Sequence, residues 1–98
     1  MEIIKKSEGS KLTIALVGRL DTTTAPELEA EIKSSLDGVT EFVLDFEALE
    51  YVSSAGLRVI LMAQKLMKKQ GSMVLVNVNA DIMEVFDITG FSDILTFA

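Results

Sequence analysis

The sequence predicts a single α/β domain built around a mixed β-sheet. Segments with the two-residue period of a strand alternate along the chain with segments that have the apolar spacing of helices. This alternation implies crossover connections and a partly parallel sheet, and an N-terminal hairpin makes the sheet mixed. The length of 98 residues fits one small domain, and a hydrophobic fraction of 49% excludes a disordered chain. We therefore assign residues 1–98 to one domain.

The first two predicted strands form a hairpin. Residues 11–20 alternate between apolar side chains such as Leu12 and side chains such as Thr13, which is typical of a strand with one buried face. Residues 2–6 are its expected partner strand, across the turn signal Glu8-Gly9-Ser10.

Two further segments, residues 41–46 and 73–78, are short and nearly continuous apolar runs. Runs of this kind are typical of strands that are buried on both faces. The first is expected to end near Asp45, where a loop follows. Residues 93–97 are a candidate for a last short strand.

Three helices are predicted between these strands, and two of them carry recognisable N-terminal signals. Thr24 is a candidate cap for the first helix, which has Pro26 in its first turn and apolar residues at four-residue spacing after it. The third helix is expected over residues 80–88, with Asn79 as a candidate cap.

The composition excludes several classes of function. Without Cys or His, the chain has no disulfide framework, zinc finger, thiol nucleophile or Ser-His-Asp triad. Nine basic and fifteen acidic residues give a net charge of −6, which argues against a nucleic-acid partner. The longest apolar run, Val59 to Ala63, is far shorter than the ~18 residues of a spanning helix. We expect a cytoplasmic protein with no membrane partner, no metal and no cofactor.

The most informative stretch is the start of the second helix, which begins at Ser53 or Ser54 and runs to about Lys69. Sites in α/β sheets lie beyond the carboxyl ends of strands, and a helix N-terminus tolerates a phosphate. These serines are therefore candidates for phosphorylation. A serine here is more commonly only a cap, and Gly56 then only allows close packing of the helix.

Other polar residues have simpler interpretations. Asp45 is a candidate acceptor for backbone N–H groups in a loop, and Asp21 is expected to fix a turn. Glu47 and Glu50 lack the companion groups of an active site. Arg58, one turn after Ser54, is either a solvated charge or the partner of an acidic residue on another protein.

Taken together, these segments resemble the STAS domain family, and within it the bacterial anti-sigma factor antagonists. The resemblance covers essentially the whole chain, and its ordered combination of short motifs is more specific than any one of them. It implies a mixed sheet of four or five strands with about three helices packed mainly on one face. The residues that carry it are Gly18 to Asp21, Thr23, Ala25, Leu28, Leu44-Asp45, Leu49 to Leu57 and Gly90-Phe91.

The resemblance also implies a function. Such antagonists, when unphosphorylated, bind an anti-sigma factor that is a serine kinase, and this releases a sigma factor. The kinase then phosphorylates a serine at the start of the second helix, the complex separates, and a phosphoserine phosphatase resets the cycle. We expect a monomeric binding module that is not an enzyme.

The family pattern at this helix start is Asp-Ser-Ser/Thr-Gly. Alignment on Gly56 makes Ser54 the phosphorylated residue, with Ser53 as the alternative. Two residues depart from the pattern, because Ser53 stands where the family has Asp and Ala55 where it has Ser or Thr. The partner-binding residues that the resemblance implies are Asp21, Thr22, Thr23, Asp45, Ser53, Ser54, Gly56, Leu57 and Arg58.

The same two departures favour an alternative function within the family. STAS-like domains also serve as non-phosphorylated scaffolds or ligand-sensing modules that act with a transporter or a signalling complex. Phosphorylation of Ser54 would be absent from such a protein.

Overall fold

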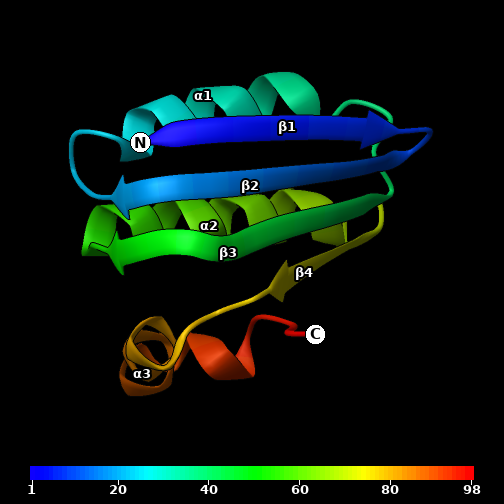
Figure 1. Cartoon of the computed structure of the whole chain (residues 1–98). Coiled ribbons are helices and arrows are strands. Elements are labelled where there is room, and N and C mark those ends of the chain that lie inside the picture. The colour runs from blue at the N-terminus through cyan, green and yellow to red at the C-terminus, as the bar shows by residue number, and fades with distance from the viewer.

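The computed structural model describes residues 1–98 and contains one four-stranded sheet with helices against one face (Figure 1). Strands β1 (Glu2–Glu8) and β2 (Lys11–Leu20) form the expected antiparallel hairpin. Strands β3 (Glu41–Val52) and β4 (Ser72–Val76) continue the sheet in parallel, in the order β1-β2-β3-β4. The predicted mixed sheet is therefore confirmed, with four strands.

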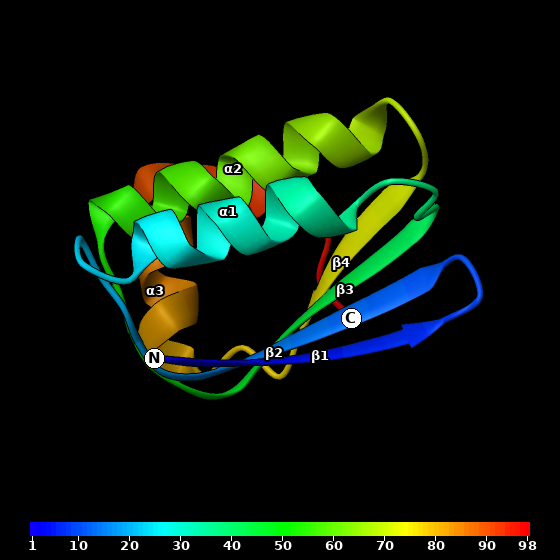
Figure 2. The same cartoon turned by 90° about the horizontal axis from the view of Figure 1, so that it is seen from above.

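The crossover connections are the helices α1 (Ala25–Ser35) and α2 (Ser54–Lys68), which lie side by side in one layer over the sheet (Figure 2). Helix α3 (Ala80–Thr89) follows β4, and a short 3-10 helix, η1 (Phe91–Asp93), comes after it. The predicted packing of helices mainly on one face is confirmed. None of the helices combines the length and the apolar character that crossing a bilayer requires.

One apolar core lies between the sheet and the helices. Leu28 and Ile32 of α1 are fully buried, as their four-residue spacing predicts, and so is Ile60 of α2. The next residue of α2, Leu61, is only partly buried. The core contains no buried polar or charged residue, so the polar residues of interest all lie at or near the surface.

Strand β3 is longer than predicted, because it continues past Asp45 to Val52. Its pairing with β2 shifts register twice, before Ala48 and again before Tyr51. Each such irregularity adds a residue to one strand and reverses which side chains face the core. The apolar alternation is therefore interrupted at the exposed Glu47, although the strand continues. Without the regular alternation, the sequence of this segment is typical of a loop.

The C-terminal residues do not form the strand expected over 93–97. They contain η1 and a single bridge in which Phe97 lies beside Leu75 of β4. Gly90 ends α3 in the left-handed conformation, with φ of 81°, and leads the chain directly into η1.

Thr24 precedes α1, but its side chain does not cap the helix as predicted. Its Oγ1 donates a hydrogen bond to the Arg19 carbonyl at 2.8 Å and accepts one from the Asp21 N–H at 2.8 Å. The side chain instead ties the start of α1 to the end of β2. Asn79 does cap α3 as predicted, since its Oδ1 accepts a hydrogen bond from the Ile82 N–H at 2.8 Å.

Gly56 brings α2 into close contact with the end of β2. A Cβ atom at this position would lie 2.6 Å from Cγ of Leu20 and 3.1 Å from the Leu20 carbonyl oxygen. Contacts this short leave no room for a side chain. The glycine therefore sets how closely the first turn of α2 approaches the sheet.

We predict that Gly56→Val lowers the free energy of unfolding by about 1–3 kcal/mol, because the added methyl groups overpack the contact with Leu20. Urea denaturation measures the effect. Ser54→Val is the matched control, since it places the same side chain on the exposed side of the same turn and should change stability by less than about 0.5 kcal/mol. Equal losses in both variants would contradict the packing role of Gly56.

Candidate functional site

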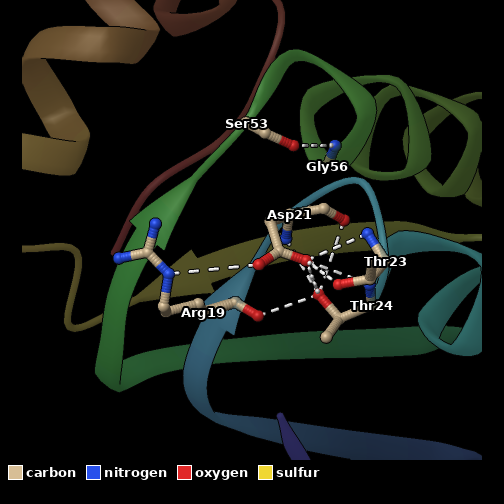
Figure 3. Close-up of polar contacts among 6 residues, drawn as sticks. All are labelled: Arg19, Asp21, Thr23, Thr24, Ser53 and Gly56. Atoms are coloured by element: carbon tan, nitrogen blue, oxygen red, sulfur yellow. Dashed lines mark hydrogen bonds and ion pairs between the residues drawn. The ribbon is translucent and has the colours of Figure 1, made fainter.

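The carboxyl ends of β2 and β3 meet the N-terminus of α2 at one corner of the molecule (Figure 3). Leu20 and Val52 pair at the ends of these strands, and the Ser53 N–H donates a hydrogen bond to the Leu20 carbonyl at 2.8 Å. Helix α2 begins one residue later, at Ser54. This is the end of the parallel strands at which α/β proteins place their binding sites.

The two serines at this corner have different environments. Ser53 has an extended backbone, and its Oγ accepts a hydrogen bond from the Gly56 N–H at 3.2 Å, so it is the N-cap of α2. Ser54 is the first residue of the helix, its side chain is exposed, and its hydroxyl makes no hydrogen bond. The capping interpretation is therefore confirmed for Ser53, and the free hydroxyl belongs to Ser54.

The turn between β2 and α1 forms a second wall of the corner. The carboxylate of Asp21 accepts hydrogen bonds from the Thr23 hydroxyl at 2.7 Å, the Thr23 N–H at 3.0 Å and the Thr24 N–H at 3.1 Å (Figure 3). These hydrogen bonds, the one from the Thr23 side chain foremost, hold the pKa of Asp21 below its ordinary value. As predicted, Asp21 fixes the turn, and it leaves Thr22 and Thr23 exposed.

Sequence reasoning missed an exposed aromatic residue at this corner. Tyr51 is 41% exposed, and the guanidinium carbon of Arg19 lies 4.3 Å from the centroid of its ring. The Nε of Arg19 is also 3.9 Å from a carboxylate oxygen of Asp21. The sequence could have indicated this residue, because Tyr51 is the chain's only tyrosine and lies two residues before Ser53. It was overlooked because this segment was predicted to be a loop.

A groove of about 520 Å³ runs between α1 and α2 from this corner. Thr22 of the turn lines it together with Ala55 and the exposed Arg58 of α2. Gly56 and Leu57 are buried, so they position the helix and present almost no side-chain surface to a partner.

The structure does not bring Asp45 to this corner. Asp45 pairs with Ala15, and Leu20 lies five positions further along β2, which is about 17 Å at 3.3 Å per residue. The carboxylate of Asp45 accepts hydrogen bonds from the Glu47 N–H and from Nδ2 of Asn77, both at 3.0 Å. Its role as an acceptor for a backbone N–H group is confirmed. It lies away from the other residues that the resemblance implies for partner binding, which gather at the end of β2 and the start of α2.

Comparison with known proteins agrees with this architecture. A family model for the STAS domain matches residues 2–98. BtrV of Bordetella bronchiseptica, provisionally named an anti-sigma factor antagonist, is 42% identical over 89 residues, which cover 89% of this chain and 77% of BtrV.

Two solved structures show the same fold. An anti-sigma factor antagonist from Mycobacterium paratuberculosis superimposes with a TM-score of 0.88 at 21% identity, over 98% of this chain and 83% of that one. The Bacillus cell fate determinant SpoIIAA in its phosphorylated form gives a TM-score of 0.78 at 22% identity, over 99% and 91% of the two chains.

A mixed four-stranded sheet with helices on one face and a polar corner before α2 defines a small α/β domain of the architecture that these solved structures share. The chain belongs to the STAS domain family.

We predict that the two serines differ in their contribution to stability. Ser53→Ala removes the cap of α2 and should lower the free energy of unfolding by about 0.5–2 kcal/mol. Ser54→Ala removes a hydroxyl with no partner and should change stability by less than about 0.5 kcal/mol. Urea denaturation of both variants tests this, and a larger loss in Ser54→Ala would reverse the assignment of the cap.

A second prediction concerns the ionisation of Asp21. Because its pKa is lowered in the folded chain, its stabilising contribution is present above the unfolded value of about 3.9 and is lost as pH falls through the folded pKa. Thr23→Val should raise the pKa of Asp21, measured by NMR titration of its carboxyl carbon. Thr22→Val, at an exposed neighbour that makes no bond to Asp21, should leave the pKa unchanged. An unchanged pKa in Thr23→Val would contradict the assigned cause.

Proposed function

We propose that the chain is an anti-sigma factor antagonist that is switched off by phosphorylation of Ser54. In its unphosphorylated form it binds an anti-sigma factor that is a serine kinase, and a sigma factor is released. The observation that carries this proposal is the free, exposed hydroxyl of Ser54 on the first residue of α2, beside a serine that is already engaged as the cap. The relationship to BtrV and to phosphorylated SpoIIAA supports it.

The kinase transfers the γ-phosphoryl group of ATP to the Oγ of Ser54, and ADP and the hydroxyl proton leave. Ser54 is the favoured acceptor because its hydroxyl is accessible. The Oγ of Ser53 is less accessible, because this residue is half-buried and its Oγ already accepts a hydrogen bond from the Gly56 N–H. The fold tolerates a phosphate on Ser54, because the first turn of a helix presents unpaired N–H groups and a partial positive charge.

One phosphate is enough to change binding without refolding the domain. It adds about −1.5 to −2 charges at pH 7. Like charges forced together at an interface cost several kcal/mol. A loss of about 2–4 kcal/mol corresponds to roughly 30- to 1,000-fold weaker binding. Asp21 lies on the neighbouring turn and is ionised at pH 7, so it adds to this repulsion.

The proposed partner surface consists of the exposed residues of this corner, which surround the kinase target. Asp21 holds the turn in shape, while Gly56 and Leu57 set the position of α2 from the buried side. The exposed residues that offer side chains to the kinase are Thr22, Thr23, Ser54 and Arg58, joined by Arg19 and Tyr51. Ser53, which is half-buried and caps α2, lies at the edge of this surface.

We further propose a monomeric, cytoplasmic binding module that is reset by a phosphoserine phosphatase. The partners supply the phosphoryl-transfer and hydrolysis chemistry, so the chain itself needs no cofactor, no metal and no catalytic group. It binds no nucleic acid in this scheme.

The alternative is a non-phosphorylated scaffold or ligand-sensing module that acts with a transporter or a signalling complex. Ser53 in place of the family's Asp favours it, because the target hydroxyl then lacks an adjacent carboxylate. In this case the corner would bind its partner permanently, and the hydroxyl of Ser54 would serve only as a contact.

The two functions predict different products when the chain is incubated with its anti-sigma factor kinase and ATP. We expect one phosphate on Ser54, located by mass spectrometry of the digested protein. Ser54→Ala should abolish incorporation, while Ser53→Ala should retain it. Incorporation that persists in Ser54→Ala would move the site to Ser53, and no incorporation into the parent chain would favour the scaffold function.

A further inference from the structure

Arg58 is a cation without an acidic partner. Its side chain is exposed, and none of the ion pairs in the structure includes it. Glu29 of α1 lines the same groove, but its carboxylate is paired with Nζ of Lys33 at 3.0 Å. The first turn of α2 contains no acidic residue. The proposed function places this charge on the partner surface but gives it no partner within the chain.

Arg58 lies four residues after Ser54 on the same helix. Side chains at this spacing lie one above the other on the same face of a helix. Helical side chains also lean toward the N-terminus, which directs an arginine at this position toward the turn that carries Ser54. Arg58 lines the groove of the corner together with Ala55, the neighbour of Ser54, and it also lines a second hollow along α2 with Leu61. An anion that precedes a cation by four residues is the favourable order for an ion pair on a helix.

We propose that Arg58 binds the phosphate of phosphorylated Ser54 within the same chain. This inference rests on the proposed function and adds a second component to the switch. A guanidinium presents paired N–H donors that match two phosphate oxygens. Before phosphorylation, Arg58 offers the partner a free positive charge. Afterwards the charge of the pair is about −0.5 to −1, so the sign of the local charge reverses.

The surroundings leave Arg58 as the cation best placed for this role. On α1, Glu29 and Lys33 neutralise each other. On α2, the next cation along the helix is Lys65, eleven residues after Ser54 and three turns away. In the neighbouring turn, Asp21 is occupied by hydrogen bonds from Thr23 and Thr24 and by the more distant contact with Arg19.

The test is the second pKa of the phosphate, measured by ³¹P NMR titration of the full chain carrying phosphoserine at position 54. The pKa of a free phosphoserine is near 6. We expect Arg58→Gln to raise the measured pKa by a few tenths of a unit relative to the parent chain, because the dianion loses its ion pair. Arg58→Lys should restore part of this difference.

Lys65→Gln is the matched control, because it removes the same charge from the same helix at a distance. Its phosphate pKa should equal that of the parent chain. The parent chain and the three variants share the same helix N-terminus, so its effect on the phosphate pKa cancels in the comparison. Equal pKa values in the parent and Arg58→Gln, or an equal rise in Lys65→Gln, would overturn the inference.

Phosphoserine is installed at position 54 during synthesis of the protein, so this test does not depend on a kinase. Failure of the kinase to modify Ser54 would refute the proposed function and leave the Arg58 contact measurable. An unchanged phosphate pKa in Arg58→Gln would refute the contact and leave the phosphorylation itself intact.

Discussion

The hydrogen bond from the Ser53 N–H to the Leu20 carbonyl fixes the position from which α2 leaves the sheet. It joins the chain to β2 immediately before the helix begins, and the bare Cα of Gly56 allows the first turn to lie against Leu20. With the helix anchored in this way, the Ser53 side chain caps the helix while Ser54 projects into solvent. The difference between the two serines is therefore a consequence of packing.

This arrangement suits a protein that provides one hydroxyl and leaves the chemistry to its partners. A phosphate at the first residue of a helix is compatible with the fold, so the proposed phosphorylation of Ser54 would alter the surface and leave the core unchanged. Arg58 would make the change larger, because the same event that adds negative charge also removes a free cation. The neighbouring turn, which hydrogen bonds to Asp21 hold in shape, would lie beside this change in charge.

Much of the fold follows from local patterns in the sequence. The hairpin and the helices were predicted because their apolar spacings are regular, and the Asn79 cap was predicted from its residue type. The full length of β3 was not predicted, because two register shifts after Asp45 reverse which of its side chains face the core. Because the strand was expected to end near Asp45, the residues that follow it were predicted to form a loop, and Tyr51 was not recognised as an exposed residue of a strand. The choice between Ser53 and Ser54 as the cap depends on tertiary contacts, so the sequence left it open.

The central claim is that phosphorylation of Ser54 alone weakens partner binding through surface charge. Isothermal titration calorimetry of the unphosphorylated chain and of the chain with phosphoserine at position 54, each against the anti-sigma factor serine kinase, tests it directly. The account predicts affinity at least about 30-fold weaker for the phosphorylated chain, which corresponds to about 2 kcal/mol. Affinities that agree within about twofold, a difference of about 0.4 kcal/mol, would contradict it.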